Sequence, residues 1–376
     1  MTDPLDLLTG ALRPGPAAPP SADPTGWERA LRLAGDHDLL PAWWSAGVAR
    51  GWWEPLPVDA LELVAARFRP GLTQPPLLLQ QAYEANRVRQ ADLLVQGRTI
   101  LAHLASAGIT AVPLKGLHTV LADWWDDPAD RVMRDLDVLV PADASGAAAG
   151  RLTSLGYLPF ATGHTDEADH ELPAVRLPGR AGSVELHTAL LVRRWSAVLT
   201  ADLVLSRGAP MSTTDAVVHS IAHAQLQDDA HLLARLPLRS LHELAVLSHG
   251  ARADEVDWAA VRGAFRRASA EAALDAHLDL ARSLFGAAVP PPRGRFRARS
   301  HTRLCRSLGA RPPVASLYEQ AVFLPRALSA DRMHRLYGPG SPWSGRIRHV
   351  GRALGGRRRP GGPAPDGPGT VPGAGP

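Results

Sequence analysis

A six-residue segment in which acids alternate with apolar residues places the strongest constraint on what this chain can fold into. Residues 135–140 read Asp-Leu-Asp-Val-Leu-Val, and this alternation with β-branched valines predicts a β-strand. Successive side chains on a strand point to opposite faces, so Asp135 and Asp137 share the face opposite to Leu136 and Val138. Two carboxylates about 6.6 Å apart along one face repel each other unless a cation lies between them. The pair therefore either faces water at a strand end or converges on divalent ions.

The surroundings of the acid pair favour the metal-binding interpretation. A strand-like run at residues 109–114 leads into Lys115 and Gly116, and a helix-like run at residues 117–125 follows. A glycine at a strand-to-helix turn allows backbone N–H groups at the helix start to face an anion, and Lys115 adds a positive charge nearby. A phosphate-binding turn followed within about twenty residues by paired acids is typical of a nucleotide-handling protein.

Four short segments, taken in chain order, carry a resemblance to a known family. They are Leu114-Lys115-Gly116, the Arg-x-Met-x-Asp-Leu-Asp-Val-Leu-Val run at residues 131–140, Leu155-Gly156-Tyr157 and Val184-Glu185-Leu186-His187. Over residues 109–187 the chain resembles the uncharacterised nucleotidyltransferase-like family of the DNA-polymerase-β superfamily. A later helical block resembles the helical extension of that family through less specific residues, namely His219, His223, Gln225, Asp228, Arg239 and Glu243.

The resemblance implies a role for each matching position. Lys115 and Gly116 would take the place of the nucleotide-phosphate turn, which in the superfamily is more usually Gly-Ser or Gly-Gly. Asp135 and Asp137 would hold the metal ions, and Glu185 would be the third carboxylate. The resemblance thus implies a two-ion Mg²⁺ site with a nucleoside triphosphate as co-substrate.

A second alternating segment, Ser-Val-Glu-Leu-His at residues 183–187, predicts another strand. Glu185 and His187 lie on the same face of that strand, so a position beside residues 135–140 would bring Glu185 to the acid pair. His187 could ligate the metal, contact a base or be a hydrogen-bonded core histidine, and we favour a role in the cleft.

Nucleotidyl transfer requires these residue types for a physical reason. Attack on the α-phosphate builds negative charge on the phosphoryl oxygens and on the departing pyrophosphate, and two Mg²⁺ ions about 3.5–4 Å apart stabilise the entering and leaving oxygens. Lys115 or Arg131 could hold the outer phosphates, and Glu185 or Asp135 could accept the proton of the acceptor hydroxyl. For Arg131 a surface role that reduces repulsion between acids is an equal alternative, and for Arg134 it is the preferred one.

Length and composition exclude several classes of protein. A chain of 376 residues is long enough for two or three structural units. The single cysteine, Cys305, excludes internal disulfides and a four-cysteine zinc site and fits a reducing cytosol. No apolar run approaches the roughly 18 residues of a membrane span, and the first residues lack a basic start with an apolar core. We therefore expect a cytoplasmic protein without a membrane partner.

The net charge of +4 does not describe the folded part of the chain. Six arginines and no acid lie between residues 346 and 359, and without them the net charge falls to −2. The basic excess is therefore a property of the tail, which we interpret as a solubilising extension. Nucleic acid is an unlikely partner, except through weak contacts with this arginine-rich tail.

Composition and periodicity divide the chain into five regions. We expect a flexible leader at residues 1–25, an N-terminal helical region at 26–108, a nucleotidyltransferase core at 109–191, a C-terminal helical region at 192–354 and a disordered tail rich in Gly, Pro and Arg at 355–376. A long helix should fill residues 75–107, with Ala91, Leu94, Leu101 and Leu104 on its apolar stripe.

Two further groups of residues have a structural and a functional interpretation. His219 and His223 would share one helix face and could bind a metal, but we prefer polar residues packing toward the cleft. The paired aromatics are more typical of a core or an interface than of base stacking, and they are Trp43, Trp44, Trp52 and Trp53.

The sequence as a whole predicts an α+β protein with a small mixed β-sheet core between N-terminal and C-terminal helical regions. The function it favours is Mg²⁺-dependent transfer of a nucleoside monophosphate from a triphosphate to a small-molecule or protein acceptor that the sequence does not identify. Two alternatives stay open, namely a catalytically silent partner-binding module with the same fold and a metal-dependent phosphohydrolase.

Overall fold

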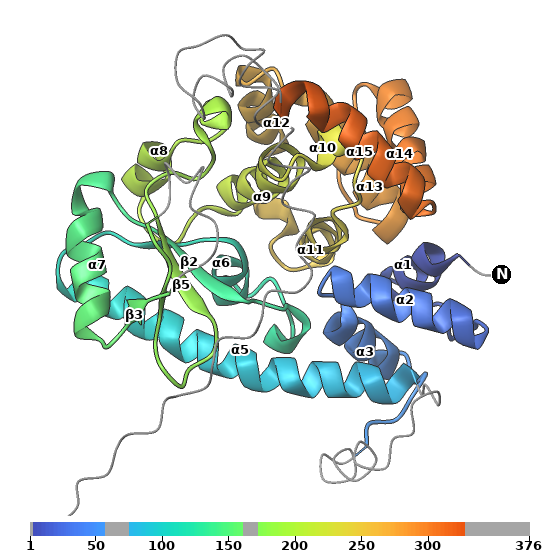
Figure 1. Cartoon of the computed structure of the whole chain (residues 1–376), viewed down its shortest axis with the longest axis horizontal. Coiled ribbons are helices and arrows are strands. Elements are labelled where there is room, and N and C mark those ends of the chain that lie inside the picture. The colour runs from blue at the N-terminus through green and yellow to red at the C-terminus, as the bar shows by residue number, and fades with distance from the viewer. Residues whose placement is uncertain (1–2, 57–74, 161–171, 328–376) are drawn as a thin grey trace, which may run out of the picture. The chain divides into compact units, whose positions relative to one another are not determined.

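Helices before and after a small mixed sheet make up the computed structural model, which describes residues 3–56, 75–160 and 172–327 (Figure 1). The strands are β1 (Val112–Pro113), β2 (Asp135–Leu139), β3 (Leu158–Pro159), β4 (Val175–Arg176) and β5 (Ser183–His187). Their order in the sheet is β1-β2-β5-β4-β3. Strands β2 and β5 run parallel, whereas the other described pairs are antiparallel. The predicted α+β class with a small mixed sheet is confirmed.

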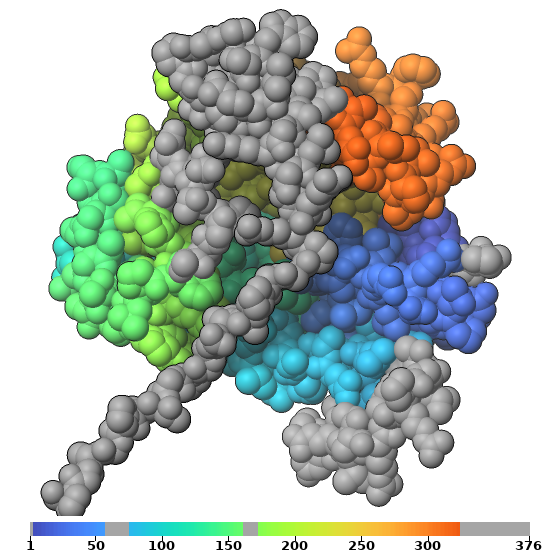
Figure 2. Space-filling view, viewed as in Figure 1, coloured from blue at the N-terminus to red at the C-terminus, as the bar shows by residue number. Residues whose placement is uncertain are grey.

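One face of the two central strands forms the core of the sheet. Leu136, Val138, Val184 and Leu186 are buried, as the alternation in both segments predicts. Helix α5 (Pro75–Ser106) packs against β2, and α7 (Ser145–Ser154) packs against β5. Figure 2 shows the surfaces of α7 (green) and of the N-terminal helices (blue) at opposite ends of α5 (cyan). The acids of β2 and β5 are therefore left on the other face of the sheet.

The N-terminal helices are α1 (Pro4–Leu12), α2 (Pro24–Asp36) and α3 (Leu40–Ala49). Helix α1 lies inside the region where the sequence predicted a flexible leader, and the structure differs there. The Asp3 carboxylate accepts a hydrogen bond from the backbone N–H of Leu5, and Leu8 is fully buried. A nine-residue helix is marginal alone, but α1 packs against α2, α3 and the later helix α13 (Glu271–Phe285). The composition indicated a leader because Pro/Ala-rich residues directly follow this short, leucine-rich helix.

Helix α5 matches the predicted long helix but buries a different face. Ala91 is exposed and Leu94 only half-buried, whereas the polar residues Asn86 and Gln96 are buried. Asn86 donates to the carbonyl of Ala129 (2.6 Å), and Gln96 donates to the carbonyl of Ala181 (2.9 Å). Leu104 is buried as predicted. The rest of the predicted stripe is not, because α5 also turns Asn86 and Gln96, which donate to backbone carbonyls, toward loops of the core.

The C-terminal helical region continues from the sheet with a series of short helices. They are α8 (Ala201–Arg207), α9 (Thr213–Ala222), a π-helical turn (His223–Gln227), α10 (Ala230–Leu233), α11 (Leu238–His249), α12 (Trp258–Arg267), α13 and α14 (Arg295–Gly309). Residues 1–310 form one compact unit, and residues 311–376 form a second one that contains α15 (Pro312–Ala327). The predicted disordered tail at 355–376 and the last part of the predicted 192–354 region lie outside the described residues. Among the helices in the described ranges, none is both long enough and apolar enough to cross a membrane.

A half-buried acid beside α3 makes the stability of the N-terminal region depend on pH. Asp130 ends the short 3₁₀ helix η1 (Pro128–Asp130) and accepts a hydrogen bond from the hydroxyl of Ser45. Burial raises the pKa of Asp130 from 3.8 to about 7, although the bond from Ser45 opposes this shift. Because the folded pKa lies above the unfolded one, the contribution of Asp130 to stability is fully present below about pH 4 and is lost as the pH rises through about 7.

We therefore expect the Asp130→Asn variant to gain stability relative to the wild type as the pH rises. The free energy of unfolding of both proteins, measured in urea at about pH 5 and about pH 8, gives the difference. The gain should be larger at the higher pH, because there the wild type holds a buried charge that the amide lacks. The exposed Asp143 supplies a control, since Asp143→Asn should change stability equally at both pH values. An equal difference for Asp130→Asn at the two pH values would contradict the assignment.

Candidate functional site

Strands β2 and β5 bring the predicted acids together. In the parallel register, Asp137 lies opposite Glu185, and Asp135 lies opposite Ser183. Gly182 allows this close pairing at the start of β5. Its φ is +70°, and a Cβ at this position would lie 2.8 Å from the carbonyl oxygen of Arg134. The prediction that the Glu185 strand lies beside the Asp135 strand is confirmed.

Asp137 is the centre of the cluster and is 3% exposed. Its Oδ1 accepts hydrogen bonds from the Lys115 ammonium (2.6 Å) and contacts His187 Nε2 (2.8 Å). His187 Nε2 also lies 3.9 Å from Glu185 Oε2. One ligand atom from each of Asp137, Glu185 and His187 lies within 4.8 Å of the others, so these three can hold one metal ion. The sequence predicted Asp135, Asp137 and Glu185 as metal ligands and metal ligation as one role for His187. This group of three contains His187 but not Asp135.

The charges of the cluster depend on one another. Burial alone would raise the pKa of Asp137, but the Lys115 ammonium and the contact with His187 hold it well below its usual range. Burial also opposes the charge on Lys115, yet Asp137 raises the pKa of that amine. The pKa of Asp135 is raised by burial and by repulsion from Asp137. At neutral pH, Asp137 and Lys115 are therefore a charged pair.

The Lys-Gly turn carries Lys115 to this cluster. Strand β1 ends at Pro113, the N–H of Leu114 donates to the carbonyl of Asp137 (2.9 Å), and α6 (Lys115–Leu121) begins at once. Lys115 has a φ of +45°, a left-handed conformation that costs about 1–2 kcal/mol for a residue with a side chain. Lys115 thus forms its charged pair with Asp137 from a backbone conformation that is unfavourable for lysine.

Gly116 serves a packing role that sequence reasoning did not foresee. Its φ is not positive, but a Cβ there would lie 2.6 Å from Met133 Cγ and 3.3 Å from Arg131 Nη2. Glycine therefore allows α6 to pack directly on the chain segment that leads into β2.

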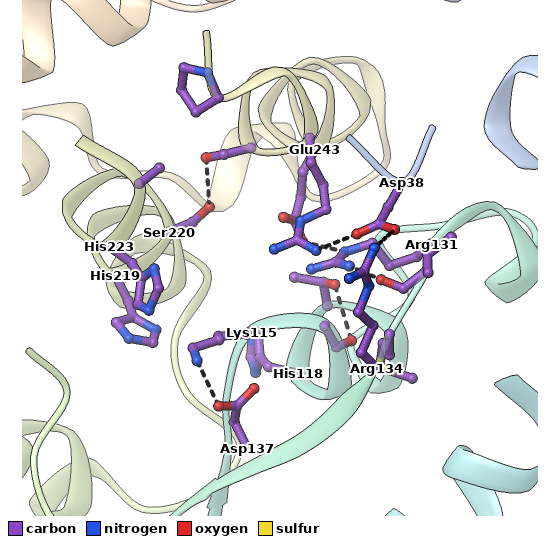
Figure 3. Close-up of a pocket in the computed structure, with 18 of the residues that line it drawn as sticks. Asp38, Lys115, His118, Arg131, Arg134, Asp137, His219, Ser220, His223 and Glu243 are labelled. Atoms are coloured by element: carbon purple, nitrogen blue, oxygen red, sulfur yellow. Dashed lines mark hydrogen bonds and ion pairs between the residues drawn. The ribbon is translucent and has the colours of Figure 1, made fainter. Parts of the chain in front are cut away.

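A cavity of about 450 Å³ opens above Lys115 and the two aspartates. Its walls come from the core, from α9 and α11 of the C-terminal region, and from the turn between α2 and α3 (Figure 3). Asp135, Asp137, Lys115, Gly116 and Arg131 all line it, whereas Glu185 and His187 do not belong to its lining residues. Five of the seven predicted site residues thus face one cavity.

Comparison with protein families identifies the family of this chain. The model of a family described as uncharacterised nucleotidyltransferase matches residues 23–286, which include every residue of the cluster. The chain belongs to this nucleotidyltransferase family. No match was found among curated proteins or among solved structures.

The family match extends through α11, where Arg131 of the nucleotidyltransferase core finds its partner. Arg131 is buried, and its Nε lies 3.4 Å from Glu243 Oε1 on α11. Both side chains line the cavity. The surface alternative for Arg131 is wrong, because this buried ion pair connects the core to the helical extension.

Arg134 lies at the surface, as we preferred, and its guanidinium pairs with an acid. Its side chain is 65% exposed, but it lines the cavity and donates from Nη2 to Asp38 Oδ1 (2.7 Å). Arg239, on α11, donates from Nη1 to Asp38 Oδ2 (3.0 Å). Sequence reasoning missed Asp38 because it lies almost a hundred residues before its partners in the core and carries no local motif.

His118 is the other site residue without a sequence signal. It is 2% exposed, lines the cavity, and has no hydrogen-bond partner among the described residues at either ring nitrogen. Burial lowers its pKa to about 4, so the ring is neutral at physiological pH. A neutral imidazole at this position can donate one hydrogen bond to a ligand in the cavity, or accept one from it.

His219 and His223 share a face of the helix, as the spacing predicts, and both line the cavity. Their rings meet edge to face with centroids 6.0 Å apart. His219 Nε2 contacts the carbonyl of Leu190 (3.2 Å), and His223 Nδ1 contacts Asp228 Oδ2 (3.2 Å). Each ring thus has a separate partner, and burial lowers the pKa of His219 well below its usual value. This geometry agrees with polar residues packing toward the cleft.

Proposed function

We propose that this protein transfers a nucleoside monophosphate from a nucleoside triphosphate to an acceptor hydroxyl, with release of pyrophosphate and with Mg²⁺ as cofactor. One observation supports the proposal above others. Asp137 and Glu185 stand opposite each other on adjacent parallel strands, with Asp135 on the same face, in a chain of a nucleotidyltransferase family. Acids paired in this way are unfavourable within a sheet unless they bind a cation.

The donor set fits a divalent cation. Asp135, Asp137 and Glu185 supply hard carboxylate oxygens, and the lowered pKa of Asp137 keeps that ligand charged. His187 Nε2 adds a nitrogen donor within the same cluster. When bound, two Mg²⁺ ions would stabilise the entering and leaving oxygens of the reaction.

The protein groups have separate tasks in this reaction. The acceptor oxygen forms a bond to the α-phosphorus, the bond from that phosphorus to the bridging oxygen breaks, and pyrophosphate leaves. Asp135 or Glu185 accepts the hydroxyl proton, since both carboxylates lie on the same face of the sheet. Lys115 lies beside Asp137 at the cavity, so its ammonium can turn to a phosphate oxygen when that carboxylate is shared with a cation. Arg131 would contribute positive charge while Glu243 holds it in place.

A catalytically silent module is the second candidate, and one contact favours it. Lys115 already neutralises Asp137 at 2.6 Å, and a lysine in this place can substitute for the charge of a metal ion. In that case the fold would serve to bind a partner, and the cavity would take nucleotide without Mg²⁺ or not at all.

Calorimetric titration separates these candidates. We expect a nucleoside triphosphate analogue with a non-hydrolysable α,β bond to bind in the presence of Mg²⁺, and to bind at least about tenfold more weakly in EDTA, because three carboxylates then face the phosphates without a cation. Equal affinity in Mg²⁺ and EDTA, or no binding by the folded protein, would contradict the proposal. Product analysis with hydrolysable nucleotides completes the test, because pyrophosphate indicates transfer whereas inorganic phosphate indicates a phosphohydrolase.

A further inference from the structure

Two arginines from different parts of the chain converge on one carboxylate at the end of the cavity away from Lys115. Arg134 precedes β2, and Arg239 belongs to α11. Both donate to Asp38, one to each carboxylate oxygen, at 2.7 Å and 3.0 Å. Figure 3 shows Asp38 and Arg134 on one side of the cavity and Lys115 with Asp137 on the other. Asp38, Arg134 and Arg239 all line the cavity.

This cluster has more positive charge and more donors than Asp38 can use. Two guanidiniums face the one carboxylate of Asp38, and Asp135 also lies within electrostatic reach of both arginines. Each guanidinium carries five N–H donors in a planar fork, and in the described contacts each gives one of them to Asp38. The arginine side chains are 65% and 47% exposed, whereas that of Asp38 is 12% exposed. Donors of this kind match the several oxygens of a phosphoryl group better than they match one carboxylate.

The backbone N–H of Asp38 is hydrogen-bonded, and among the described residues these two bonds hold its side chain. Asp38 lies between α2 and α3 with a φ of +58°, a left-handed conformation that aspartate tolerates, and its N–H donates to the carbonyl of Gly35 (3.2 Å). A rotation about its side-chain bonds is therefore enough to move the carboxylate away from the two arginines.

We propose that Arg134 and Arg239 form a phosphate-binding subsite of the cavity, and that the Asp38 carboxylate occupies this subsite until a phosphoryl group displaces it. The ligand class rests on the proposed nucleotidyltransferase function. The subsite lies within electrostatic reach of Asp135, since Arg239 counteracts the rise in the pKa of that carboxyl. The phosphoryl group belongs either to the outer part of the triphosphate or to a phosphorylated acceptor.

The test measures binding of sodium pyrophosphate in EDTA at low ionic strength, so that neither metal nor transfer is required. We expect Asp38→Asn to raise the affinity for pyrophosphate about tenfold, because the amide removes the competing charge and leaves two unpaired arginines. Arg134→Gln, which replaces a largely exposed side chain, should lower the affinity severalfold. Asp143→Asn is the control, because this exposed aspartate lies outside the cavity lining and makes neither bond to these arginines, and it should leave the affinity within about twofold.

The same variants distinguish the two sources of the phosphoryl group. If the subsite holds the triphosphate tail, pyrophosphate competes with the non-hydrolysable analogue, and Asp38→Asn also strengthens binding of the analogue. If it holds a phosphorylated acceptor, both ligands bind together and the affinity for the analogue is unchanged.

A structural role for Asp38 predicts the reverse result. If Asp38 only joins the N-terminal helices to the core and α11, Asp38→Asn lowers the melting temperature and leaves pyrophosphate affinity unchanged or reduced. That result, or an unchanged affinity in Arg134→Gln, overturns the inference. Increased pyrophosphate binding by Asp38→Asn in a protein without transfer activity would support the subsite and count against the proposed function alone.

Discussion

Replacing Asp137 with asparagine should reduce nucleotidyl transfer at least about 10³-fold, equivalent to about 4 kcal/mol of transition-state stabilisation. Asp137 is the buried centre of the cluster, within ligand distance of both Glu185 and His187. The amide removes the negative charge that binds a cation and also leaves the Lys115 ammonium without its ionic partner. Release of pyrophosphate from a radiolabelled triphosphate, with Mg²⁺ saturating, gives the rate.

Two controls make this result specific to the charge on Asp137. Asp143→Asn changes an exposed aspartate shortly after β2 and should keep full activity. The circular dichroism spectrum of the Asp137→Asn protein should match that of the wild type, because asparagine has the same shape and its carbonyl can still accept from Lys115. Activity of a folded Asp137→Asn protein within about twofold of the wild type would exclude Asp137 as a metal ligand.

Replacing Trp43 with alanine should cost about 3–5 kcal/mol of unfolding free energy. Trp43 lies on α3, is fully buried and stacks on Trp27 with ring centroids 5.4 Å apart. Because α3 packs against both α1 and α5, the cavity left by the indole would lie where the N-terminal helices meet. Denaturant unfolding should show a lower midpoint at unchanged slope.

The Trp43→Phe variant is the matched comparison. It keeps an aromatic ring for Trp27 and removes an indole N–H that has no hydrogen-bond partner among the described residues. We expect it to cost less than about 1.5 kcal/mol. If Trp43→Ala and Trp43→Phe lowered stability equally, packing at this position would not be the source of the effect.

The strands and their faces could be predicted because a period of two is a local property. Leu136 and Val138 are fully buried, and Asp137 faces the cavity, as alternation alone requires. The adjacency of β2 and β5 followed from the same pattern together with the family resemblance. The predicted stripe of α5 was right only at Leu104, because the burial of Gln96 depends on a carbonyl 85 residues away.

The sequence by itself determined the family, the α+β class and the acids that share a strand face, since short-range alternation and ordered motifs carry that information. Only the tertiary structure decided that His187 and Lys115 meet at Asp137, and that Asp38 lies between Arg134 and Arg239. These contacts join residues between 22 and 201 positions apart. Their geometry depends on how helices pack around the sheet, which is set by the whole core and not by any one segment.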